Sequence, residues 1–172
     1  KLDPLHHCVY SVGHKRLTAS GQRLAASMSV DIDLAMTARF SAGHQQRLTT
    51  RRPRHGLTEV AVPSYRGDRR TDVRILRLGS LTEADRVVLD GVPCTTVSRT
   101  LLDLAGVLSE HDLGKAIREA DFHGTLDLVA LAATIARVDR PRGLVKLREL
   151  LALEPARHCD SRFERRVLRL LL

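Results

Sequence analysis

The first part of the chain alternates between a short apolar run and a helical pattern. Residues 7–12 (HCVYSV) have the aromatic and β-branched content of a strand. From Thr18 to about Met28 the spacing predicts a helix, with Thr18 or Ser20 as the N-cap. Leu17, Leu24 and Met28 then share one face, since they follow the helical spacing.

The middle of the chain is predicted to form strands and loops. Residues 30–40 (VDIDLAMTARF) fit a helix or a strand, and both interpretations stay open. Residues 43–56 are polar and basic and read as a loop. Residues 57–63 and 71–78 alternate between apolar and polar positions, which predicts two strands. We expect them to form a hairpin whose tip lies around residues 66–70.

The rest of the pattern predicts a change from sheet to helices. Residues 85–96 (DRVVLDGVPCTT) add one or two short strands that turn at Asp90 and Gly91. From there on the spacing is helical. The helix starts are marked by Thr96, Ser109, Asp127, Pro141 and Asp160 or Ser161, and Leu113, Ile117 and Ala120 are predicted core positions. This order predicts an α+β fold, with a small mixed β-sheet and a following run of four or five helices.

Composition narrows the class of protein. Apolar residues make up 43% of the 172 positions, which is enough for a buried core. Aromatic residues make up only 3%, which argues against an aromatic platform for stacking single-stranded bases. Three scattered cysteines argue against a disulfide framework and a zinc ribbon. Neither a membrane-spanning run nor a signal peptide is recognisable, so we expect a cytoplasmic protein with no membrane partner.

The net charge of the chain is the property that most narrows its possible partners. The net charge is +8 and the pI is about 10.2, which favours contact with nucleic acid or with an acidic partner protein. The alternative is that these arginines are solvated loop residues of an Arg-rich composition. The candidate nucleic-acid-binding residues are Lys15, Arg16, Arg47, Arg51, Arg52, Arg54, Arg66, Arg69 and Arg70. If the loop and the hairpin tip lie together, they form a basic rim that binds phosphates with little sequence preference.

Residues 91–105 (GVPCTTVSRTLLDLA) join a strand end to a helix start. A nucleophile elbow needs glycines two residues before and after its serine, and Ser98 has none there. Thr96 fits the role of an N-cap. Arg99 and Asp103 lie four residues apart on one helix face, where they can form an ion pair. We therefore interpret the segment as a structural joint.

Other motifs that carry chemistry are incomplete. Neither GxGxxG nor a phosphate-binding loop with its lysine occurs. His6, His7 and Cys8 are adjacent, and neighbouring residues of a strand point to opposite faces, which spoils a shared zinc site. Asp31 and Asp33 have no third ligand nearby in the sequence. We expect no cofactor and no metal.

Two segments resemble a known family. Residues 91–124 (GVPCTTVSRTLLDLAGVLSEHDLGKAIREADFHG) resemble a G-(I/V)-P-V-T-(S/T)-x-x-R-T-L-L-D-L-A segment and the helix after it in AbiEi-type antitoxin regions of type IV toxin–antitoxin systems. Residues 5–26 (LHHCVYSVGHKRLTASGQRLAA) resemble the segment that precedes it there. In many actinobacterial proteins such a region is joined to a C-terminal nuclease-like domain related to the very-short-patch-repair endonucleases. The resemblance spans roughly residues 5–172.

The resemblance implies three parts. Residues 1–16 would be the wing remnant of a winged-helix domain, and residues 17–156 an antitoxin-like α/β region. Residues 157–172 would be the first helix of a truncated nuclease-like domain. The recognition helix of the winged helix would lie before the first residue, which leaves Lys15 and Arg16 at the wing for phosphate contacts.

The last segment, SRFERRVLRLLL, supplies the one catalytic candidate. Glu164 matches an acidic residue of the first nuclease helix, and the further carboxylates and the lysine that hold Mg²⁺ would lie after Leu172. The chain starts with Lys1 and stops inside this amphipathic helix. We therefore expect a piece of a longer protein.

The chain also departs from the family pattern. Ala38 and Leu76 stand where the family has histidine, and Gln45 and Gln46 stand where it has Trp-Gly. If those family residues form a functional pocket, this chain lacks it. If they are core residues, the helix around residues 37–47 is locally destabilised.

Three hypotheses follow for the function. The leading one is an antitoxin-like regulatory and DNA-associated module without catalytic activity in this chain. It would bind DNA through basic loops, or bind a toxin or another acidic protein. The second is the N-terminal part of a PD-(D/E)XK, very-short-patch-repair-like endonuclease whose catalytic strands are missing. The third is a non-functional remnant.

Overall fold

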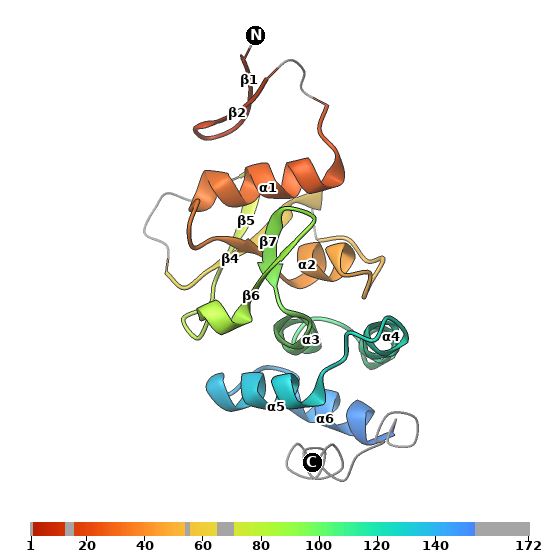
Figure 1. Cartoon of the computed structure of the whole chain (residues 1–172). Coiled ribbons are helices and arrows are strands. Elements are labelled where there is room, and N and C mark those ends of the chain that lie inside the picture. The colour runs from red at the N-terminus through yellow and green to blue at the C-terminus, as the bar shows by residue number, and fades with distance from the viewer. Residues whose placement is uncertain (1, 13–15, 54–55, 65–70, 154–172) are drawn as a thin grey trace.

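The computed structural model describes residues 2–12, 16–53, 56–64 and 71–153. In these ranges a two-stranded hairpin, a five-stranded sheet and six α-helices follow one another in layers (Figure 1). The α+β class expected from the sequence is confirmed. The predicted part at residues 157–172, including Glu164 and the caps Asp160 and Ser161, lies outside the described residues.

The strands form two separate sheets. They are β1 (Leu2–His6), β2 (Val9–Val12), β3 (Met36–Thr37), β4 (Thr58–Val62), β5 (Val73–Arg77), β6 (Arg86–Leu89) and β7 (Val92–Thr95). β1 and β2 pair with each other alone. The larger sheet has the order β5-β4-β3-β7-β6 and is mixed, because β3–β7 and β4–β5 are parallel and the other two pairs are antiparallel.

The hairpin predicted from residues 57–63 and 71–78 is wrong. Both strands form, but β4 and β5 pair parallel, with Glu59 opposite Arg74 and Val60 opposite Ile75. A tight turn cannot join parallel strands, because the chain must return to the other end of the sheet. The connection is therefore a crossover and not a hairpin tip.

Two other strand predictions fare differently. The turn between β6 and β7 is confirmed: Asp90 and Gly91 both have positive φ, at 50° and 74°, as a two-residue type I′ hairpin requires. The single strand predicted over residues 7–12 is in part wrong. β2 begins only at Val9, and Cys8 lies in the turn of the β1–β2 hairpin with a φ of 58°.

The helices are α1 (Ala19–Val30), α2 (Arg39–Gln45), α3 (Val97–Ala105), α4 (Glu110–Phe122), α5 (Leu128–Arg137) and α6 (Leu144–Leu153). Four of the helices begin at the caps that the sequence marks, whereas α6 begins three residues after Pro141 and the start of α2 was not predicted. The side chains of Thr18, Thr96, Ser109 and Asp127 each accept a hydrogen bond from a backbone amide of the first turn. The predicted caps are thus confirmed, because each satisfies an amide that the helix leaves unpaired.

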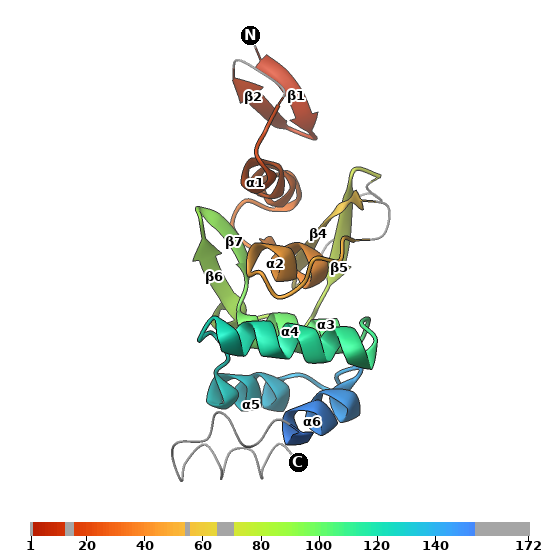
Figure 2. The ribbon, with the colours of Figure 1, turned by 90° about the vertical axis from the view of Figure 1, so that its right-hand side faces the viewer.

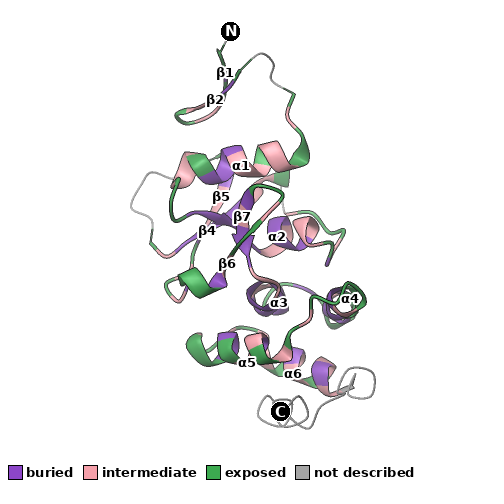
Figure 3. Cartoon of the chain, in the orientation of Figure 1, coloured by how far each residue is buried: buried purple, intermediate pink, exposed green. Residues whose placement is uncertain are grey.

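Helix α1 covers one side of the sheet with small side chains. Ala25 and Ala26 are buried against the sheet, and Ala26 shares an apolar cluster with Val60 and Val62 of β4. Buried, intermediate and exposed residues are interleaved along α1 (Figure 3). Met28, on the predicted helix face, is 42% exposed. The close approach of α1 to the strands favours alanine over longer side chains at the contact.

Helices α3 and α4 form one further layer, and α5 and α6 form the next (Figure 2). Leu101 and Leu104 of α3 are fully buried at the centre of the main apolar cluster. Leu113, Ile117 and Ala120 of α4 belong to the same cluster, as the helical spacing predicts. This rigid stack fixes the α3–α4 turn against α2 and the sheet.

Candidate functional site

The segment at residues 91–105 forms a closed ionic joint. The side chain of Arg99 is only 1% exposed, and it donates from Nε to both carboxylate oxygens of Asp103 at 3.2 and 3.3 Å. Its Nη1 lies 3.3 Å from Oδ2 of Asp85, and its Nη2 donates to the hydroxyl of Ser80. Because every nitrogen of the guanidinium has an acceptor, nothing in this arrangement is left for a ligand.

Asp85 extends the joint to a second α-helix, α5. It is fully buried, and its Oδ1 accepts from Nη2 of Arg137 in α5 at 2.8 Å. Its Oδ2 also accepts from the backbone amide of Thr82. Burial raises the pKa of Asp103, although the neighbouring Arg99 partly opposes this shift. The joint thus ties the loop before β6 to α3 and α5, which supports the structural interpretation of the segment.

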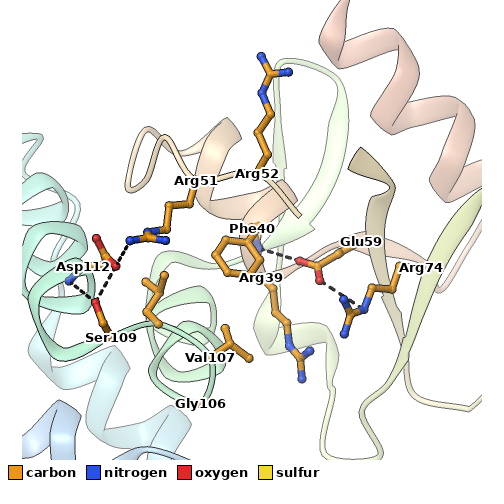
Figure 4. Close-up of a pocket in the computed structure, with 11 residues that line it drawn as sticks. Arg39, Phe40, Arg51, Arg52, Glu59, Arg74, Gly106, Val107, Ser109 and Asp112 are labelled. Carbon is orange, nitrogen blue, oxygen red and sulfur yellow. Dashed lines mark hydrogen bonds and ion pairs between the residues drawn. The ribbon is translucent and has the colours of Figure 1, made fainter. Parts of the chain in front are cut away.

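A pocket of about 610 Å³ opens beside the turn that follows α3. Phe40 of α2 lies at its centre, and Val107 and Leu108 of the α3–α4 turn line it as well (Figure 4). Charged and polar side chains stand to both sides of the Phe40 ring. They are Arg39, Glu59 and Arg74 on one side, and Arg51, Ser109 and Asp112 on the other.

At the first end, a buried carboxylate is held by the backbone and by arginine. Oε2 of Glu59 accepts from the amide of Phe40 at 3.0 Å, and Oε1 lies 3.6 Å from Nε of Arg74. Burial raises the pKa of Glu59, and the charges of Arg74 and Arg39 act against this shift. The Nε of Arg39 is buried and has no hydrogen-bond partner among the described residues.

At the second end, an ion pair stands at the start of α4. Nη2 of Arg51 lies 2.6 Å from Oδ2 of Asp112, which also accepts from the hydroxyl of Ser109 at 2.6 Å. The Ser109 hydroxyl, followed by Arg51, lowers the pKa of Asp112. The carboxylate therefore stays ionised and occupied by its two donors.

The pocket carries more positive than negative charge. Four arginines line it against the two carboxylates of Glu59 and Asp112. Arg52 forms no ion pair within the part of the chain that the structure describes. Arg52 and Phe40 also line a second hollow of about 260 Å³, which Arg23 and His44 border. The two hollows together make one cationic region around Phe40, which favours anionic ligands.

The structure places the predicted binding residues unequally. Arg51 and Arg52 line the pocket, and Arg47 is exposed on the loop after α2. Arg16 is exposed ahead of α1, on another part of the molecule. The remaining candidates lie outside the described residues: Lys15, Arg54, Arg66, Arg69 and Arg70.

Sequence reasoning missed the other charged residues of the pocket. Arg39 sits in the segment whose secondary structure stayed open, and Glu59 and Arg74 are neighbours only because β4 and β5 pair parallel. The one local signal was the polar Glu59 within an apolar strand, since a buried carboxylate needs a partner. In the joint, Asp85 and Arg137 were missed in the same way.

Of the departures from the antitoxin pattern, Ala38 and Leu76 are buried, and Gln45 and Gln46 are half-buried. Ala38 and Leu76, which replace histidines of that pattern, belong to the same apolar cluster beside Ala61. Nε2 of Gln45 donates to the carbonyl of Leu89 at 2.7 Å, and Nε2 of Gln46 donates to the carbonyl of Thr95. These bonds join α2 to the β6–β7 hairpin. The apolar pair and the glutamine pair therefore each have a structural role in this chain.

The class of this protein is defined only by its fold and by the charge of its pocket. Across the described ranges, histidine, cysteine, aspartate and glutamate nowhere gather in a group of three that could hold a metal ion. None of the helices there has the length and apolar character needed to cross a membrane. A scan against protein-family models finds no match, and a search of the curated proteins finds no significant match. Fold and site define a mixed α+β protein with a cationic pocket.

Proposed function

We propose that the chain is an antitoxin-like regulatory module that contacts DNA and has no catalytic activity of its own. The observation that carries the proposal is the excess of arginine around one pocket and its rim. Arg51, Arg52 and the exposed Arg47 come from a single loop between α2 and β4. A net charge of +8 adds attraction at longer range.

The chemistry of this rim fits phosphodiester groups better than base edges. Guanidinium groups donate to phosphate oxygens in pairs, and such contacts position a protein without reading sequence. Binding of this kind releases counterions, so it weakens steeply with salt. A regulator of this type therefore has broad affinity for duplex DNA, and any sequence preference has to come from another part of the protein.

Fluorescence anisotropy with a random duplex at about 50 and 200 mM salt tests the proposal. We expect affinity to fall at least about tenfold over this range, and the Arg51→Ala/Arg52→Ala variant to lower it further at the lower salt. A single Arg52→Ala variant should also bind more weakly than the unaltered chain. Arg140→Ala is its matched control and should leave binding unchanged, because the Arg140 side chain is 94% exposed and does not line the pocket. Absence of binding at the lower salt rejects the proposal.

The endonuclease alternative makes a separate prediction. It depends on Glu164, which lies outside the described residues, and on carboxylates that would follow in a longer protein. Incubating the full-length gene product with supercoiled plasmid and Mg²⁺ discriminates between the two. Nicking that is lost in Glu164→Gln supports the nuclease, whereas binding without nicking supports the regulatory module.

A further inference from the structure

The pocket around Phe40 has the size of a small-molecule site. Its volume of about 610 Å³ lies within the range of about 300–1,000 Å³ that is typical of ligand pockets. A phosphodiester backbone passing over the rim does not need such a depth. The pocket therefore calls for a ligand that enters it.

The charge of the pocket indicates what kind of anion fits. Both carboxylates, Glu59 and Asp112, are engaged by donors that the fold itself supplies. Four arginines against two carboxylates leave an excess of two positive charges. A phosphate monoester carries about −1.5 to −2 at neutral pH and matches this excess. A single carboxylate or a phosphodiester carries only one negative charge.

Arg39 marks the position of that anion. Its backbone lies in the left-handed region with a φ of 48°, a strained conformation for a residue with a side chain. Its buried Nε has no partner in the described part of the chain, although an unsatisfied buried donor is costly. Arg74 stands at the same end of the pocket, beyond Glu59 (Figure 4). An anion between the two arginines would satisfy the free donor.

The rest of the pocket fits the body of a nucleoside. The Phe40 ring, Val107 and Leu108 form an apolar centre, and aromatic rings are common stacking partners for bases. At the far end, the bonds of Asp112 to Arg51 and Ser109 both use Oδ2, which leaves Oδ1 to face a ligand in the pocket. Such an oxygen atom can accept hydrogen bonds from sugar hydroxyls and base amino groups.

We infer that this pocket binds a nucleoside phosphate, with the phosphate monoester at Arg39 and Arg74 and the nucleoside along Phe40. The ligand is a free mononucleotide or the 5′-phosphorylated end of a nucleic-acid strand. In the second case the next nucleotide continues into the smaller hollow beside Arg23 and His44. The inference does not depend on duplex binding at the rim, because the monoester at Arg39 is the group recognised.

Isothermal titration calorimetry with AMP, adenosine and inorganic phosphate tests the inference on the unaltered chain. We expect AMP to bind at least about tenfold more tightly than either adenosine or inorganic phosphate, since both halves of the ligand contribute. Equal affinity for AMP and adenosine overturns the assignment of the phosphate. Equal affinity for AMP and inorganic phosphate overturns the nucleoside part. Absence of AMP binding overturns the whole inference.

A pair of variants locates the site. Arg39→Gln should bring the affinity for AMP down to that for adenosine, whereas Arg140→Gln removes the same charge from an exposed position and should leave it unchanged. The Nε–H resonance of Arg39 supplies a second readout that needs no variant. It should shift on addition of AMP and not on addition of adenosine. Loss of AMP binding in both variants alike would contradict the placement.

The source of the ligand is decided with short single strands that carry or lack a 5′-phosphate. Tighter binding of the phosphorylated strand identifies a strand end as the ligand, and equal binding together with AMP binding identifies the free nucleotide. Failure of duplex binding at low salt would reject the proposed DNA contact and leave this result intact. Failure of AMP binding would reject the nucleoside-phosphate site and leave the proposed DNA contact intact.

Discussion

The joint around Arg99 and the pocket around Phe40 use the same residue types in different proportions. In the joint, two arginines meet two aspartates, and the charges balance. In the pocket, four arginines meet two carboxylates, and the Nε of Arg39 has no hydrogen-bond partner among the residues that the structure describes. The joint lies on α3 and the pocket lies beside the turn that follows it, so the same helix borders a closed and an open cluster.

The difference teaches how to separate structure from function in an arginine-rich chain. A buried guanidinium is tolerated when every donor has an acceptor, and it then fixes the elements around it. An incomplete cluster leaves buried donors unsatisfied, and a strained backbone such as that of Arg39 costs stability. The two regions differ in whether every hydrogen-bond donor has an acceptor, and not in whether charged residues are present.

The largest expected effect comes from breaking the joint. Asp85→Ala leaves the buried Arg99 with one carboxylate fewer and frees Arg137 from its partner. Removing one member of a buried ion cluster typically costs about 3–5 kcal/mol, because the remaining charge stays buried without compensation. Urea unfolding followed by circular dichroism measures this loss. Glu83→Ala, an exposed site of the same turn, is the control and should shift the midpoint little.

The sequence predicted elements and caps better than the contacts between elements. Thr96 and Ser109 were recognisable because capping is a local interaction that spans three residues. The Asp90–Gly91 turn was recognisable for the same reason. The balance of charges in the joint could not be recognised in the sequence, because Asp85 and Arg137 lie 52 positions apart and only tertiary packing joins them.

The pocket shows how one error in topology hides a site. An antiparallel hairpin with its tip near residue 68 would bring Glu59 close to Arg77. The parallel pairing places Glu59 opposite Arg74, and so brings a second arginine to the pocket. Alternating patterns predict strands but do not distinguish parallel from antiparallel pairs. The loop arginines Arg51 and Arg52 were identified because they are consecutive in sequence.

A smaller effect is expected when the pocket loses its strained residue. In Arg39→Gly the left-handed backbone becomes unstrained, which offsets the lost attraction of Arg39 to Glu59 and Asp103. We expect the free energy of unfolding to stay within about 1 kcal/mol of the unaltered chain, while AMP binding is lost. Urea unfolding and calorimetry measure the two properties. A stability loss as large as that of Asp85→Ala would show that Arg39 is structural.

The pH dependence of the joint should be smaller still. Because burial raises the pKa of Asp103 above its ordinary value of 3.8, the folded chain binds more protons than the unfolded chain between that value and the raised pKa. The contribution of Asp103 to stability therefore falls as pH rises through this window. Relative to Asp103→Asn, the unaltered chain should gain stability as pH falls from neutral to about 4. Parallel urea midpoints of both proteins over this range would contradict the shift.

The smallest effect on folding is expected at the open end of the pocket. Arg51→Ala removes an exposed guanidinium from Asp112, and the urea midpoint should not change measurably. The pKa of Asp112 should rise but remain below 3.8, because the Ser109 hydroxyl is the larger cause of its lowering. Carbon-13 titration of the carboxylate measures this, with Ser109→Ala expected to give the larger rise. If Arg51→Ala instead destabilises the fold strongly, the pair at this end resembles the joint, and the contrast between the two clusters fails.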